Sequence, residues 1–106
     1  MDNLVNAYGS ASRSANLTGK PQEAADYAES ALKGDPAQTW IDINRAHAYL
    51  LLGRFDEAKA IYLAKKDLKT NNATETFADT IRNDFELLGR LSDVPDLARM
   101  RKELGL

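Results

Sequence analysis

The side chain best suited to acid–base or metal chemistry in this chain of 106 residues is His47, its one histidine. A catalytic or metal-binding histidine needs further ligands or a positioned nucleophile beside it. The chain has no cysteine, no HExxH or GxSxG motif and no Gly-Lys phosphate-binding loop. We therefore predict a non-enzyme without metal or cofactor, in which His47 is a surface histidine. Acidic residues such as Asp84 and Glu86 are interpreted as parts of solvated helix faces.

A second group of residues is suited to binding rather than to catalysis. Four side chains follow one face of a predicted helix at steps of 3, 4 and 4 residues: Trp40, Ile43, His47 and Leu51. The same segment carries apolar residues on a second face, at Ala46, Tyr49 and Leu52. A helix that is apolar on two faces is either buried on both or binds a partner with one. Trp40 is thus either a core residue, covered by later helices through Phe77 or Ile81, or an anchor for a partner.

The segment that positions these side chains, Asn44 to Tyr62, is predicted to form two helices joined by a turn at Gly53. Its phrase Gly-x-x-x-Glu-Ala, GRFDEA at 53–58, also occurs 34 residues earlier as GKPQEA at 19–24. One pair of helices cannot bury its own apolar face, so a stack of similar pairs is expected.

With this period, the chain resembles the tetratricopeptide repeat family. The matching positions are Ser12, Ala15, Gly19, Ala24, Ala31 and Asp35-Pro36 in the first repeat, and Ala46, Tyr49, Gly53, Phe55, Ala58 and Tyr62 in the second. The resemblance implies an all-α solenoid of antiparallel helix pairs, a superhelix of about six helices in a single domain. The first repeat covers about 5–38 and the second about 39–72. A divergent capping pair covers about 73–106 and resembles the tails that follow such repeats in bacterial proteins.

Hydrophobic periodicity and capping residues predict helices at 3–18, 21–34, 37–52, 55–68, 74–88 and 94–104. Gly34 is expected to end the second helix in the left-handed conformation, and Thr74 to cap the fifth. The polar stretch KKDLKTNN after the fourth helix is predicted to be a solvated loop.

The resemblance also implies that the first helix of each pair lines a concave groove, which receives a peptide or a partner's helix. The predicted partner-binding residues are Arg13, Trp40, Ile43, Asn44, His47 and Leu51. Family members that grip a C-terminal carboxylate carry Lys, Asn and Arg at fixed positions on these helices, and only Asn44 matches. Gly9, Arg13, Thr74 and Ala78 occupy the other positions, so binding of chaperone tails is disfavoured. Arg13 and Asn44 either contact a peptide or are solvated polar residues.

Composition limits the class of partner. The net charge of −2, from 14 basic and 16 acidic residues, argues against nucleic acid, which requires a dense basic face. No apolar run approaches the ~20 residues of a membrane-spanning helix, so no membrane insertion is expected. The sequence predicts protein or peptide partners and, by default, a cytoplasmic location. A homo-oligomeric scaffold and an excised regulatory region of a larger protein are the alternatives.

Overall fold

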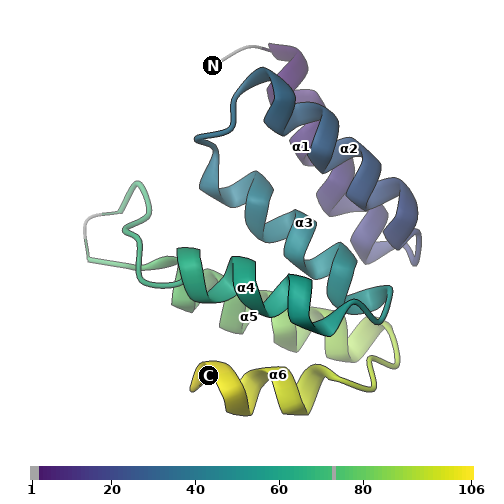
Figure 1. Cartoon of the computed structure of the whole chain (residues 1–106), viewed down its shortest axis with the longest axis vertical. Coiled ribbons are helices and arrows are strands. Elements are labelled where there is room, and N and C mark those ends of the chain that lie inside the picture. The colour runs from purple at the N-terminus through teal and green to yellow at the C-terminus, as the bar shows by residue number, and fades with distance from the viewer. Residues whose placement is uncertain (1–2, 73) are drawn as a thin grey trace.

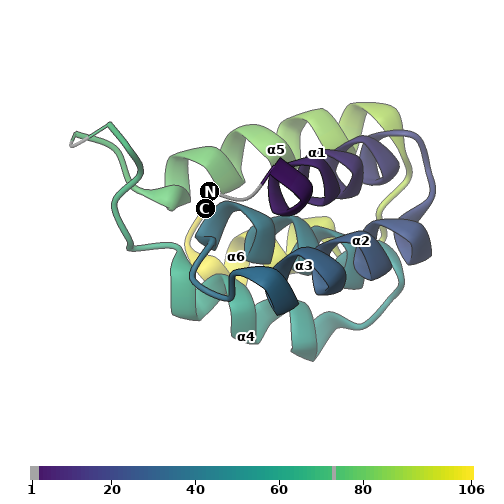
Figure 2. The ribbon, with the colours of Figure 1, turned by 90° about the horizontal axis from the view of Figure 1, so that it is seen from above.

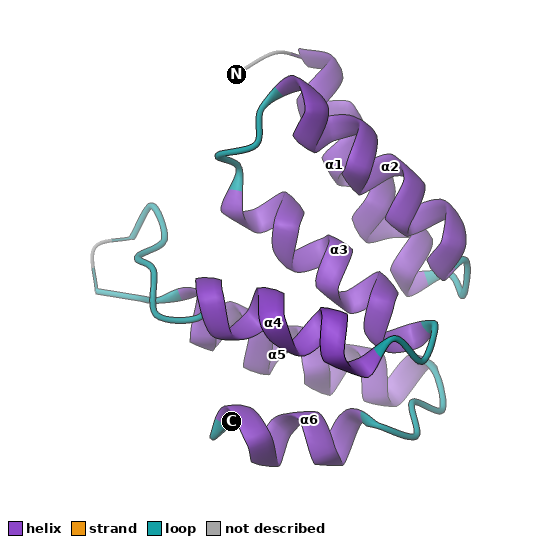
Figure 3. Ribbon diagram, in the orientation of Figure 1, coloured by secondary structure: helices purple, strands orange, loops and turns teal. Residues whose placement is uncertain are grey.

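The computed structural model describes residues 3–72 and 74–106. Helices make up most of this part of the chain (Figure 1, Figure 3): α1 (Asn3–Leu17), α2 (Pro21–Gly34), α3 (Thr39–Leu51), α4 (Phe55–Lys65), α5 (Phe77–Leu91) and α6 (Leu97–Leu104). The described residues contain no strand, and their one isolated antiparallel bridge joins Lys69 to Thr76. The predicted all-α fold is confirmed. None of the helices within these ranges is long and apolar enough to cross a membrane.

The first four helices form a stack in which each helix packs on the next one along the chain. α1 packs on α2, α2 on α3 and α3 on α4, while α6 packs on α4 and α5. Figure 1 shows this order from the N-terminal pair down to α6. Seen from above, α1 and α5 lie on the same side of the molecule and α4 on the opposite side (Figure 2). Because α3 also packs on α1, it lies in the middle of the stack.

The two turns that join α1 to α2 and α3 to α4 have the same geometry. Gly19 and Gly53, 34 residues apart, have φ angles of 77° and 79°, which glycine adopts without the steric cost of a Cβ. In each turn the amide after the glycine donates a hydrogen bond of 2.8 Å to the carbonyl five residues back: Lys20 to Ala15, and Arg54 to Tyr49. This helix-ending motif satisfies a carbonyl that the helix leaves unpaired. The sequence repeat is therefore also a repeat of backbone structure.

Small side chains let paired helices approach closely. Ala46 and Ala58, on the packed helices α3 and α4, are both fully buried. On α2, four alanines are buried: Ala24, Ala25, Ala28 and Ala31. The Ser12 hydroxyl donates a hydrogen bond of 2.7 Å to the Ala24 carbonyl and so joins α1 to α2. The C-terminal half has larger core residues: Tyr62, Ile81, Phe85, Leu88 and Met100.

Gly34 does not have the predicted left-handed conformation, because the positive φ angles belong to Gly19, Gly53 and Gly105. The residue after it, Asp35, is extended and closes α2 by donating its N–H to the Ala31 carbonyl at 3.0 Å. A Cβ at position 34 would lie 2.7 Å from Cγ2 of Val5. Glycine thus serves helix packing at this position, and the predicted cap is wrong.

The region between α4 and α5 also differs from the prediction. Backbone hydrogen bonds connect its two sides, from Thr70 N–H to the Glu75 carbonyl and from Phe77 N–H to the Leu68 carbonyl. Because these groups pair with each other, α4 ends at Lys65 rather than at 68, and α5 begins at Phe77 rather than at 74. The result is a hairpin-like loop that projects from the stack (Figure 1).

Two other boundaries shift in the C-terminal pair. α5 continues through Gly89, predicted to terminate it, as far as Leu91. α6 begins at Leu97 rather than at 94, because the preceding residues form the turn in which Leu97 N–H donates to the Val94 carbonyl at 3.1 Å.

The packing at Gly9 generates a prediction about stability. A Cβ added there would lie 2.5 Å from the indole of Trp40 and 2.8 Å from Cγ1 of Ile41, which is fully buried. Gly9→Ala should therefore lower the free energy of unfolding by about 1–3 kcal/mol, although alanine favours helix. Gly89→Ala is the matched control, since its nearest contact is 3.2 Å from the terminal methyl of Leu97. Urea denaturation followed by circular dichroism measures both, and a Gly9→Ala protein at least as stable as wild type would contradict the packing.

Candidate functional site

The structure divides the six predicted partner-binding residues into two groups. Arg13, Trp40 and Leu51 are exposed or partly exposed. The side chains of Ile43, Asn44 and His47 are buried, with exposed fractions of 1%, 4% and 2%. These three side chains lie in the interior, beneath the surface between α1, α3 and α5. In this conformation they offer almost no area to a partner.

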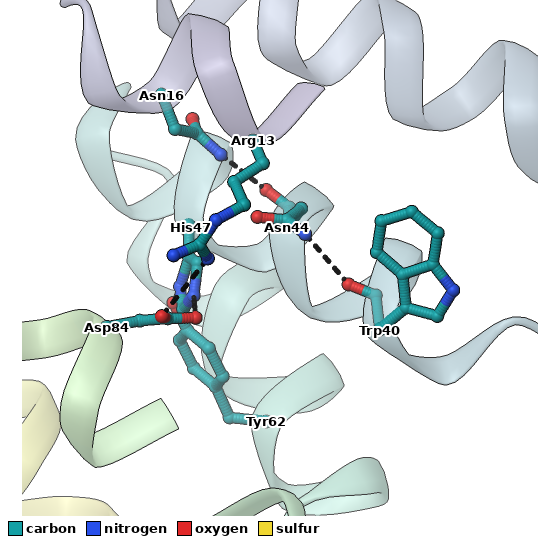
Figure 4. Close-up of polar contacts among 7 residues, drawn as sticks. All are labelled: Arg13, Asn16, Trp40, Asn44, His47, Tyr62 and Asp84. Atoms are coloured by element: carbon teal, nitrogen blue, oxygen red, sulfur yellow. Dashed lines mark hydrogen bonds and ion pairs between the residues drawn. The ribbon is translucent and has the colours of Figure 1, made fainter. Parts of the chain in front are cut away.

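His47 is not a surface histidine, and that prediction is wrong. Its ring lies at the centre of a chain of polar groups drawn from four helices (Figure 4). Nδ1 of His47 is 2.6 Å from the Tyr62 hydroxyl on α4, and Nε2 is 2.9 Å from Oδ2 of Asp84 on α5. The other oxygen of Asp84 accepts from Nη1 of Arg13 on α1 at 3.2 Å. The chain therefore links α1, α3, α4 and α5.

The direction of these hydrogen bonds follows from the acidities of the end groups. Burial raises the pKa of Tyr62 well above its usual value, so the phenol keeps its proton and can donate it to Nδ1. Nε2–H of a neutral His47 then donates to the Asp84 carboxylate. The ring is further enclosed by Phe85, whose centroid lies 5.9 Å away. Every polar atom of His47 is thus satisfied within the protein.

Asp84 is the charged member of the chain. Burial acts to raise its pKa, but the hydrogen bonds from His47 and Arg13, together with the positive charge of Arg13, outweigh that effect and hold the pKa below its usual value. The interpretation of Asp84 as part of a solvated face is wrong. A signal was present in the sequence, because Asp84 lies three residues after Ile81 and four before Leu88, within the apolar stripe of α5.

A second polar cluster, which sequence reasoning missed, joins α1 to α3. Nδ2 of Asn16, a buried residue, donates to the Asn44 carbonyl at 2.9 Å, and Nδ2 of Asn44 donates to the Trp40 carbonyl at 3.0 Å (Figure 4). The amide oxygens of Asn16 and Asn44 have no hydrogen-bond partner. Asn16 thus ties α1 to the middle of α3, whereas the Asn44 amide bonds within its own helix.

Trp40 is partly exposed and lines two hollows. The first, which we call the Phe77 hollow, has a volume of about 570 Å³; its lining includes Gln38, Thr39, Trp40, Lys69, Phe77 and Thr80. The second, the Arg13 hollow, has a volume of about 410 Å³ and is lined by Ser10, Arg13, Ser14, Leu17, Thr18 and Trp40. Nε1 of Trp40 donates to the Gln38 side chain at 3.2 Å. Of the two residues predicted to cover Trp40, Phe77 lines a hollow beside it and Ile81 is buried in the core.

The polar groups around His47 are paired within the protein. His47 and Asp84 pair with each other, and their other hydrogen-bond partners are Tyr62 and Arg13. In the described part of the chain, no group of three or more His, Cys, Asp or Glu side chains is placed to hold a metal ion. The accessible part of this region is the partly exposed indole of Trp40, which lines both hollows.

The Asp84 chain generates a prediction about pH. Because the folded pKa of Asp84 is lowered, its stabilising contribution is fully present above the unfolded pKa of about 3.9 and is lost as pH falls from there through the lower folded value. Asp84→Asn should lower the free energy of unfolding at pH 7 by about 1–3 kcal/mol and should lose less stability than wild type in that acid range. Urea denaturation as a function of pH measures both effects.

Asp67→Asn is the matched control, because Asp67 is exposed and its ion pair among the described residues is with Lys66 next to it. It should change the free energy of unfolding by less than about 0.5 kcal/mol. Equal losses in the two variants would contradict a structural role for the Asp84 chain.

Comparison with known families identifies one match. Residues 17–72, just over half of the chain, match the Tetratricopeptide repeat family. Comparison with curated proteins and with solved structures gave no significant match.

Proposed function

Because the chain belongs to the tetratricopeptide repeat family, whose repeats generally mediate protein–protein interactions, we propose that it is a non-catalytic binding module. Its site is the surface between α1, α3 and α5, which receives an extended or helical segment of a partner protein. The observation that carries this proposal is the position of Trp40. A large aromatic side chain, partly exposed and flanked by two hollows, is the kind of residue that dominates protein interfaces.

The distribution of side chains on α3 supports this proposal. Its polar residues Asn44 and His47 are buried, whereas Trp40 is partly exposed. Burial normally favours the large apolar residue over the polar ones. A partly exposed indole beside buried amide and imidazole groups is therefore more consistent with a surface that binds a partner than with packing alone.

The remaining contacts are proposed for Arg13 and Leu51. Leu51 lies at the other end of α3 from Trp40, about 16 Å away along a helix with a rise of ~1.5 Å per residue. Arg13 lies on α1 between them, with 44% of its side chain exposed. Trp40 and Leu51 would anchor apolar side chains of the partner, and Arg13 would orient a polar group.

The proposed mechanism is binding to a preformed surface. Ile43, Asn44 and His47 contribute to it indirectly, because they lock α3 to α1, α4 and α5 through buried contacts. A surface that is already ordered loses less conformational entropy when a partner binds. Most of the conformational entropy lost on binding is then lost by the partner segment.

Peptide selection tests this proposal. Peptides selected on the wild-type protein should bind it at least about tenfold more tightly than they bind Trp40→Ala, since aromatic anchors contribute about 2 kcal/mol or more. Affinities are measured by isothermal titration, with circular dichroism to establish that the variant is folded. Tyr27→Ala is the matched control, because Tyr27 is another partly exposed aromatic residue and lines neither hollow. Peptides that bind all three proteins equally would contradict the site.

A second candidate function, self-assembly, is favoured by one observation. The first helix pair exposes Leu4 and Tyr27 at 58% and 37%, and Tyr27 stacks on Tyr8 with ring centroids 6.1 Å apart. Such a face is suited to packing against a second copy of the chain.

Sedimentation over a wide concentration range distinguishes the two candidates. The binding-module proposal predicts the mass of one chain at every concentration. A mass that rises with concentration, and returns to that of one chain in Tyr27→Glu, would instead favour self-assembly, because a buried carboxylate opposes association. Glu23→Gln, an exposed change on the same helix, is the control for nonspecific charge effects.

A further inference from the structure

The two hollows beside Trp40 share an unusual charge. The chain as a whole carries a net charge of −2. Among the described residues that line the Phe77 hollow, the charged one is Lys69, and among those that line the Arg13 hollow it is Arg13. Neither lining includes a carboxylate. In this net acidic molecule, the described residues that line the two hollows beside the partly exposed Trp40 therefore include two cations and no carboxylate.

Arg13 and Lys69 both have N–H donors that the side-chain contacts among the described residues do not use. Arg13 uses Nη1 to reach Asp84, and a guanidinium has five N–H donors. Lys69 is exposed and forms no ion pair with any residue in the described ranges. Its backbone, however, is held in the loop by the bridge to Thr76. The ammonium group thus extends from a fixed point beside the Phe77 hollow.

From this charge pattern we infer that the partner is an acidic segment, in which a large apolar side chain lies between Asp or Glu residues. The apolar side chain packs against Trp40, and the flanking carboxylates face Arg13 in one hollow and Lys69 in the other. Charge-assisted hydrogen bonds of this kind are stronger than neutral ones. The inference rests on the proposed function, since it names the partner of the same surface.

A peptide explains the surface better than a polyanion does. Binding of nucleic acid depends on many phosphate contacts along a dense basic face. Two cations separated by an indole do not provide such a face, but they match one apolar side chain with acids on both sides.

The experiment uses Trp40 as its own reporter, because it is the one tryptophan in the chain. The probe is a synthetic peptide with a central Leu flanked by Asp and Glu, acetylated and amidated so that it has no terminal charges. The comparison peptide replaces each Asp and Glu by Asn and Gln. Each is titrated into the full chain while the Trp40 emission is recorded, at low salt and at about 1 M salt, where the Debye length is about 3 Å.

The acidic peptide should bind about tenfold more tightly than the amide peptide at low salt, and most of this difference should disappear at high salt. Lys69→Gln and Arg13→Gln should each weaken its binding about two- to fivefold. Lys69→Gln is the more secure test, because Arg13 also pairs with Asp84. Lys102→Gln, an exposed lysine on α6 that lines neither hollow, should leave the affinity unchanged.

Three results would overturn the inference. Equal affinity for the two peptides would contradict the preference for an acidic segment, although the proposed surface would still bind a peptide. Equal weakening by Lys69→Gln and Lys102→Gln would show that the attraction is not local to the hollows. Absence of binding by the acidic peptide would also exclude the inference. The proposed binding surface would then be tested by the peptide selection with Trp40→Ala alone.

Discussion

The burial of α3 on nearly all of its sides is the constraint on which the rest of the structure depends. α3 carries an amide and an imidazole, Asn44 and His47, into the interior, and buried polar groups must find hydrogen-bond partners. His47 finds them on α4 and α5, whereas the Asn44 amide nitrogen donates within α3 to the Trp40 carbonyl. Asn16 of α1 in turn donates to the backbone carbonyl of Asn44. These hydrogen bonds hold three other helices in fixed positions around α3. The surface beside Trp40 is a consequence of that arrangement, since its walls are the helices that the buried polar groups hold.

The sequence alone predicted those features that depend on local backbone geometry. The turn at Gly53 and its equivalent at Gly19 follow from the 34-residue period. Features that depend on distant partners were not predicted. Asp84 lies 37 residues from His47 and 71 from Arg13, so nothing near it in the sequence shows that its charge is compensated. Likewise, α4 and α5 are shorter at their facing ends than predicted, because the residues between them pair with each other.

For the same reason, the sequence predicted only part of the candidate site. The spacing of Trp40, Ile43, His47 and Leu51 correctly defines one face of α3, but spacing cannot decide which members of a face are covered. That depends on how far α1 and α5 extend over it. Arg13 and Asp84 meet across the middle of this face, over His47, and leave its two ends more open. The partly exposed residues are accordingly those at the ends, Trp40 and Leu51.

The contact between Arg13 and Asp84 also bears on how the chain folds and opens. In a repeat solenoid each unit normally touches only its neighbours, and the array can lose its ends one unit at a time. Here the first helix is joined through a carboxylate to the fifth, and through the same carboxylate to the third. Loss of α5 therefore removes Asp84 from the buried imidazole at the centre, and loss of α1 removes Arg13 from Asp84. Local opening of the terminal pairs is coupled to the core, and the short stack behaves as one cooperative unit rather than as a row of independent repeats.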